Sequence, residues 1–125
     1  IGNCLMNISH REYESIPYYE KAMEGLTIGY RIGNHREKKV PLDVIELLGR
    51  AYHKNYEFDK AIDKFEFYSN FLAENNWDDK RANNRRIRQS KYAEDLKNNP
   101  VNVDVVPIKS VNSKYPEYRP KVNAE

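Results

Sequence analysis

The sequence predicts an all-α fold in which helix–turn–helix pairs stack into an α-solenoid. Three observations predict it: apolar residues recur at helical spacing in long segments, short polar breaks separate these segments, and one helical pair has a partial copy nearer the N-terminus. The length of 125 residues suits one ordinary domain. We expect a helical repeat domain over residues 1–99 and an extended segment over residues 100–125.

The clearest repeat runs from about Leu42 to Ala73. Its first helix follows Pro41, which the first turn of a helix tolerates, and its second begins after the polar break at residues 55–57. Gly49 and Ala61 lie on the two helices, and their small size allows the helices to approach closely. Large residues fill the space around that contact, namely Ile45, Leu48, Tyr52, Phe58, Ile62, Phe65, Tyr68 and Leu72.

This pattern resembles the tetratricopeptide signature. The matching residues are Leu48, Gly49, Tyr52, Phe58, Ala61 and Phe65. The sequence departs from the signature at Ile45, where the family favours tryptophan, and at Ala73, where it favours proline. The resemblance implies antiparallel helix pairs in a module that binds proteins.

A partial copy of the repeat lies upstream. Gly2 takes the place of Gly49 at the end of a first helix, and Ser15, Tyr19 and Ala22 take places on a second helix. A capping box over residues 9–12 (Ser-His-Arg-Glu) is expected between them. Pro17 fits a first helical turn.

The remaining segments complete the expected organisation. Residues 28–39 carry glycines and a charge run, which predicts an exposed connection. A third helix is expected from about Asp79 to Lys97. Its thin apolar stripe of Ile87, Ser90 and Ala93 suits a terminal helix that packs on one neighbour. Valines that alternate with polar residues after residue 100 indicate a strand or an extended linker.

Composition limits the classes of partner. Apolar residues make up 39% and charged residues 32% of the chain, as in globular domains, and no apolar run is long enough to span a bilayer. The formal net charge is +2 with both signs interspersed, which argues against a nucleic-acid binder. The chain begins inside a helical pattern without methionine and ends at the apparent start of another element. We therefore expect a fragment of a longer protein.

Several motifs follow one another along the chain. They are Pro41-Leu42-Asp43, Leu48-Gly49-Arg50-Ala51-Tyr52-His53, residues 55–62 (Asn-Tyr-Glu-Phe-Asp-Lys-Ala-Ile), Asn99-Pro100-Val101, Val111-Asn112-Ser113, Tyr115 and Glu117-Tyr118-Arg119-Pro120. Their order resembles the N-terminal part of the OmpA-family envelope proteins of Bacteroidetes, the PorE-like type IX secretion components. In that family a tetratricopeptide domain precedes a WD-type β-propeller and a peptidoglycan-binding OmpA-like domain. The last motifs look like the entry into the first propeller blade of that family.

The resemblance implies a non-catalytic protein–protein scaffold in a bacterial cell-envelope assembly, which links outer-membrane secretion machinery to peptidoglycan. It implies a periplasmic, outer-membrane-associated location and a protein or peptide partner in the envelope. Contacts with membrane and peptidoglycan would involve parts outside this chain. Cys4 lies in a helical pattern and is expected to be structural, not the lipid-bearing cysteine of that family. Two alternatives stay open: a cytoplasmic adaptor or regulator built on the same repeats, and the regulatory arm of a downstream enzyme.

Repeat geometry predicts where a partner binds. Stacked pairs curve, and the first helix of each pair lines the concave side. Five residues of the clear repeat lie off the apolar stripe of its first helix and are expected to face that groove, namely Asp43, Glu46, Arg50, His53 and Lys54. Tyr18, Tyr30 and Tyr56 either add contacts or belong to the core. Simple exposure to solvent is the alternative for the five groove residues.

A second candidate surface is a basic patch in the third helix. Its residues are Lys80, Arg81, Arg85, Arg86, Arg88 and Lys91. An acidic partner, lipid headgroups or peptidoglycan carboxylates would suit the patch, and a solvated outer face is the alternative.

Motifs for catalysis, metals and cofactors are missing from the sequence. His10, His35 and His53 lack metal-ligand spacing, and no serine lies in a nucleophile elbow. One cysteine allows neither an internal disulfide nor a cysteine-based zinc site. The carboxylates at residues 78–79 come just before a helix, whose N-terminus they favour. We therefore expect neither enzymatic activity nor a cofactor.

Overall fold

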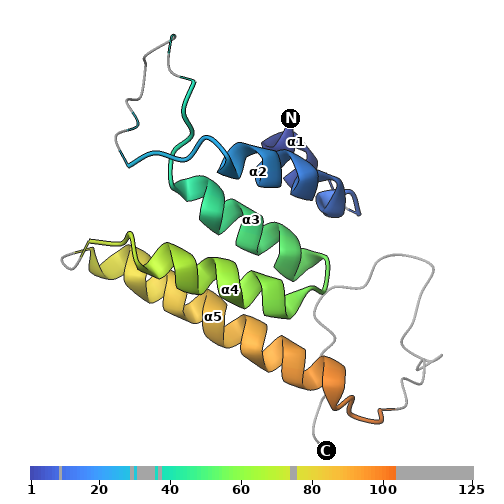
Figure 1. Cartoon of the computed structure of the whole chain (residues 1–125). Coiled ribbons are helices and arrows are strands. Elements are labelled where there is room, and N and C mark those ends of the chain that lie inside the picture. Colours follow the sequence, from blue (N-terminus) through green and yellow to red (C-terminus); the bar gives the residue numbers. More distant parts are fainter. Residues whose placement is uncertain (9, 29, 31–35, 37, 74–75, 104–125) are drawn as a thin grey trace, which may run out of the picture.

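The computed structural model describes residues 1–8, 10–28, 30, 36, 38–73 and 76–103. Within these ranges the fold is all-α, as predicted. The helices are α1 (Gly2–Met6), the 3-10 helix η1 (Glu12–Ser15), α2 (Ile16–Met23), α3 (Asp43–Lys54), α4 (Phe58–Ser69) and α5 (Trp77–Asn98). Figure 1 shows α3, α4 and α5 side by side in chain order, with α1 and α2 on the other side of α3.

The pair of α3 and α4 forms the centre of the core. Each helix has apolar residues at intervals of three or four, so each presents one apolar face to its neighbour. Gly49 of α3 faces the Phe65 ring of α4, and a Cβ at Gly49 would lie only 2.7 Å from Phe65 Cε1. Ala61 is fully buried beside this contact. The small residues therefore let the two helices approach closely, as the sequence predicts. The other buried residues of the pair are Val44, Ile45, Leu48, Ala51, Tyr52, Phe58 and Ile62.

A Schellman motif reverses the chain between α3 and α4. The Tyr56 N–H donates to the carbonyl of His53 at 3.2 Å, and the Glu57 N–H donates to the carbonyl of Tyr52 at 3.0 Å. These bonds satisfy carbonyls that the end of α3 leaves free. Tyr56 has a left-handed backbone (φ 61°), a conformation that glycine usually supplies at this position. The polar break predicted at residues 55–57 therefore ends α3 by a defined turn.

The long helix α5 buries only a narrow face. Asn83 and Ser90 are its buried residues. The Asn83 side-chain amide donates to the carbonyl of Phe65 at 2.7 Å and to the Ser69 hydroxyl at 2.8 Å. Small and polar residues at this contact let α5 lie close to α4. The helix begins two residues earlier than predicted, because Asn76 caps it by accepting the Asp79 N–H at 3.3 Å.

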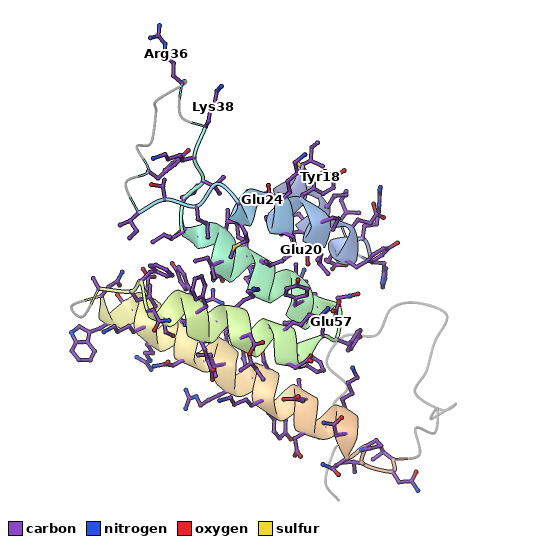
Figure 2. The ribbon with its side chains drawn as sticks, in the orientation of Figure 1. Tyr18, Glu20, Glu24, Arg36, Lys38 and Glu57 are labelled. Atoms are coloured by element: carbon purple, nitrogen blue, oxygen red, sulfur yellow. The ribbon has the colours of Figure 1, made fainter. Side chains whose placement is uncertain are left out.

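The N-terminal helices form a smaller pair against α3. Tyr19 is buried against Gly2, where a Cβ would lie 3.2 Å from the ring, and its hydroxyl donates to Asn3 Oδ1 at 2.7 Å. The Gly2–Tyr19 contact thus repeats the Gly49–Phe65 contact in a looser form. Glu20 lies between α2 and α3 (Figure 2), where it accepts a hydrogen bond from the Tyr52 hydroxyl of α3. Pro17 lies in the first turn of α2, as expected.

Two expectations about helices need correction. α4 ends at Ser69, so Leu72 lies in the turn that follows and not on the apolar face of the helix. Cys4 lies in α1 as expected, but its side chain is exposed and does not pack in the core.

The connections agree with the sequence where the structure describes them, because residues 28, 30, 36, 38 and 39 are exposed. Between α2 and α3, Val40 forms an isolated parallel bridge with Leu26, and the Val40 N–H donates to the carbonyl of Gly25 at 2.8 Å. After α5, residues 101–103 are exposed and non-helical. Ser9 of the expected capping box and residues 104–125, with the expected propeller motifs, lie outside the described residues.

Gly49→Ala is expected to lower the free energy of unfolding by about 1–3 kcal/mol, even though alanine favours a helix over glycine by about 1 kcal/mol. The added methyl group meets the Phe65 ring, which is 1% exposed and has no room to move. Urea unfolding followed by circular dichroism measures the change. Gly2→Ala is the matched control and should cost less, because the Tyr19 ring lies farther away. Equal losses would contradict a specific close contact at Gly49.

Candidate partner-binding site

Three hollows border α3 in the described part of the chain. The two smaller ones measure about 180 and 210 Å³, and the third measures about 400 Å³. The first, here called the inner groove, lies between α3 and α5 and is lined by Arg50, His53, Lys54, Phe65, Arg86 and Gln89. The second lies on the α1 side and is lined by Asn3, Met6, Asn7, Tyr19, Leu47 and Arg50. Pockets for small molecules usually measure about 300–1,000 Å³, so the two smaller hollows better suit single side chains of a polypeptide.

An ion pair joins α3 to α5 beside the inner groove. Glu46 Oε1 lies 2.8 Å from Arg86 Nη2 and 3.9 Å from Arg50 Nε. The same oxygen lacks a hydrogen bond of good geometry, so the attraction is electrostatic. Burial raises the pKa of Glu46, and the two arginines oppose that shift. Glu46 is therefore a largely buried carboxylate that holds α5 against α3.

His53 forms a second link between the same two helices. Its Nδ1 lies 2.9 Å from Ser90 Oγ, and its ring meets Phe58 edge-on at a centroid distance of 5.2 Å. Burial lowers the pKa of His53, which keeps the imidazole neutral at neutral pH. Ser90 is fully buried where α4 and α5 meet. A nucleophile must reach its substrate, so we assign the His53–Ser90 pair a packing role.

The two ends of α3 are also tied to neighbouring segments. The Lys54 ammonium donates to the carbonyl of Met6 and to Glu12 Oε1, both at 3.3 Å. Asp43 Oδ1 accepts a hydrogen bond from the Tyr68 hydroxyl of α4 at 3.3 Å. Burial, together with the Asp43 carboxylate, raises the pKa of Tyr68 to about 12. These contacts fix α3 between its neighbours on both sides.

The five residues predicted for the groove are divided between two hollows that share Arg86. Arg50, His53 and Lys54 line the inner groove, whereas Asp43 and Glu46 line the hollow of about 400 Å³. There Glu46 pairs with Arg86, and Asp43 accepts a hydrogen bond from Tyr68. Sequence periodicity predicts which face of a helix a residue occupies, but it does not predict which residues of other helices contact it. For the same reason the sequence did not indicate the uncharged lining residues Asn3, Asn7 and Gln89. Tyr18, Tyr30 and Tyr56 are exposed and line neither hollow.

The predicted basic patch of α5 is not a single surface. Arg86 lines the inner groove, Lys91 Nζ pairs with Glu66 Oε1 of α4 at 3.0 Å, and Lys80 is half-buried. Arg81, Arg85 and Arg88 are exposed. Successive helical residues are rotated by about 100°, so six cations in twelve positions spread over several faces of the helix.

Other classes of site find no support in the described part of the chain. Its His, Cys, Asp and Glu residues nowhere gather in the groups of three or more that a metal ion would need. None of its helices is both long enough and apolar enough to cross a membrane. Comparison of the chain with known protein families, curated proteins and solved structures gave no match. The candidate site therefore rests on its geometry.

Arg86→Ala is expected to lower the free energy of unfolding by about 1–2 kcal/mol, because it leaves Glu46 without its nearer counter-charge. The loss is smaller than for a fully buried ion pair, because this pair is partly exposed. Arg85→Ala is the matched control and should change stability by less than about 0.5 kcal/mol, since Arg85 is exposed. Urea unfolding at neutral pH measures both. The Glu46→Gln/Arg86→Ala variant should recover much of the loss. Equal losses at residues 85 and 86 would contradict the role of the ion pair.

His53 should make stability depend on pH below its ordinary pKa of 6.5. Because burial lowers the pKa in the folded state, the unfolded chain binds the proton first as the pH falls. The contribution of neutral His53 to the free energy of unfolding is therefore fully present above about pH 6.5 and is lost as the pH falls toward the lower folded-state pKa. His53→Asn keeps a polar group near Ser90 and should flatten the curve between about pH 6.5 and pH 5. Melting temperatures of the wild type and the variant across this range test the prediction. Identical pH profiles of the two proteins would rule out His53 as the source of the pH dependence.

Proposed function

We propose that the chain is a tetratricopeptide-like repeat domain, which binds a protein or peptide partner in the inner groove and carries out no catalysis. The observation that carries the proposal is the pair of side-chain-sized hollows that flank α3, with Arg50 on the border of both. A polypeptide laid across α3 would place neighbouring side chains in the two hollows.

The repeat part of the proposal is supported by two similar helix pairs. In each pair a glycine of the first helix faces an aromatic ring of the second: Gly2 with Tyr19, and Gly49 with Phe65. α5 then packs on α4 and corresponds to the first helix of a third unit. The residues that resemble the tetratricopeptide signature are all buried. They act together as the contact surface of one pair, which is what a repeat unit requires.

The binding part is supported by the chemistry of the groove walls. Arg50 and Arg86 bring guanidinium donors, and Gln89, Asn3 and Asn7 bring amides that both donate and accept. Peptide carbonyls and carboxylates are natural partners for such groups. Phe65 and Met6 add apolar contact at the bases of the two hollows. Polar walls over apolar bases suit a polypeptide better than a purely apolar ligand.

We further propose that the partner belongs to a bacterial cell-envelope assembly, in which the protein is a periplasmic scaffold linking outer-membrane secretion machinery to peptidoglycan. This part rests on the resemblance of the sequence motifs to the OmpA-family envelope proteins. The motifs at residues 41–62 cover the residues just before α3, α3 itself, the turn after it and the start of α4, whereas those at 111–120 lie outside the described residues.

An affinity capture experiment tests the groove with two matched variants. Arg50→Glu/Gln89→Glu removes the net positive charge of the residues that line the inner groove, and Lys21→Glu/Asn70→Glu makes the same change in charge at exposed residues elsewhere. Both variants must keep the helicity and melting temperature of the wild type. A protein from envelope extract should be captured by the wild type and the control, and about tenfold less by the groove variant, as expected for the loss of a few polar contacts.

Two results would contradict parts of the proposal. Equal capture by the groove variant and the control would exclude the inner groove as the binding site. Capture from cytosolic extract, with none from the envelope, would exclude the envelope assembly while leaving the groove in place.

A further inference from the structure

The middle of α5 is strongly basic. Residues 80–93 contain six cations and no carboxylate, while the acidic residues of the helix lie near its ends, namely Asp78, Asp79, Glu94 and Asp95. Four of the nine arginines in the chain fall within residues 81–88. The positive charge is therefore concentrated and consists largely of guanidinium groups.

Three of these arginines are free of partners within the described residues. Arg86 and Lys91 pair with carboxylates of α3 and α4. Arg81, Arg85 and Arg88 have neither an ion pair nor a hydrogen bond from their side chains to any described residue, and all three are exposed. The fold uses the cations on the inner side of α5 and leaves those on the outer side available.

The free arginines lie between two exposed aromatic rings. Trp77, Arg81, Arg85, Arg88 and Tyr92 are separated by three or four residues, which places them along one face of the helix. We call this row the outer stripe; it spans about 22 Å at the rise of an α-helix. Trp77 is 76% and Tyr92 66% exposed. Figure 2 shows side chains projecting from α5 on the side away from α4.

An open hollow of about 740 Å³ lies beside the outer stripe. It is lined by Trp77, Asp78, Lys80, Arg81, Asn84, Ile87 and Arg88. The indole and the Ile87 side chain give it an apolar part next to the guanidinium groups. A ligand that fits both would combine carboxylates with an apolar side chain.

The composition of the stripe favours a protein over other anionic partners. Protein interfaces are enriched in tryptophan, tyrosine and arginine and depleted in lysine, and the same three residue types dominate energetic hot spots. Planar guanidinium groups pair with carboxylates in bidentate fashion. The stripe lacks the aliphatic residues that a membrane-binding helix inserts. Its arginines have no aromatic rings between them to stack with successive nucleic-acid bases.

We propose that the outer stripe binds an acidic segment of a partner protein. Arg81, Arg85 and Arg88 pair with carboxylates spaced by four and three residues on a partner helix, and an apolar side chain of that helix enters the hollow beside Trp77. This surface lies on a different face of α5 from the inner-groove residue Arg86, so it goes beyond the function proposed above and can succeed or fail independently of it.

Tryptophan fluorescence reports on this surface directly, because Trp77 is the only tryptophan of the chain. The probe is a synthetic amphipathic helix with glutamates at positions i, i+4 and i+7 and leucines beside them, titrated against the full chain. Tryptophan emission should shift and saturate, and binding should weaken as salt rises. The same peptide with glutamine in place of glutamate should bind at least about tenfold more weakly, as expected for the loss of three exposed ion pairs.

Matched variants locate the binding. Arg81→Glu/Arg85→Glu/Arg88→Glu should raise the Kd at least about tenfold, whereas Lys21→Glu/Lys38→Glu/Lys64→Glu, with the same net charge, should leave it unchanged. If the first variant is unfolded by circular dichroism, the triple arginine-to-glutamine variant takes its place. Absence of saturable binding, equal losses in both variants, or equal binding of the glutamine peptide would overturn the proposal. Tighter binding of anionic phospholipid vesicles or a single-stranded oligonucleotide would also overturn it.

Discussion

The contact between Gly49 and the Phe65 ring sets how closely α3 approaches α4, and the rest of the structure depends on that distance. A Cβ at residue 49 would lie 2.7 Å from the ring, so any larger residue would push the helices apart. Phe65 also contacts the helix on the other side of α4, because its backbone carbonyl accepts a hydrogen bond from the Asn83 side chain of α5. One residue of the central helix thus holds a neighbour on each side.

The inner groove follows from this arrangement. Because α3 and α5 both lie close to α4, their side chains come within reach of each other, as the links of Glu46 to Arg86 and His53 to Ser90 show. Leaving one of these buried polar groups without its partner would cost stability, so the links fix the positions of the groove walls. The same packing turns the other side of α5 outward, where the arginines of the outer stripe have no described partner.

Local features of the fold could be predicted from the sequence because each depends on neighbouring residues. Helical periodicity, the small residues at 49 and 61 and the polar break at 55–57 predict α3, α4 and the turn between them. Asn83 was missed because its partners, Phe65 and Ser69, lie far from it in the sequence. The ion pair between Glu46 and Arg86 could not be predicted for the same reason: the sequence assigns these two residues to different candidate sites, and their contact depends on the packing of separate helices.

The most direct test of this account is a nuclear Overhauser spectrum of the full chain in solution. Close packing of α3 on α4 requires cross-peaks between the Phe65 ring protons and the Hα protons of Gly49, since the ring meets that residue at van der Waals distance. Their presence, together with slow rotation of a tightly enclosed ring, is the predicted result. A freely rotating Phe65 ring without contacts to Gly49 would show that the helices are held farther apart, and the inner groove would lose its basis.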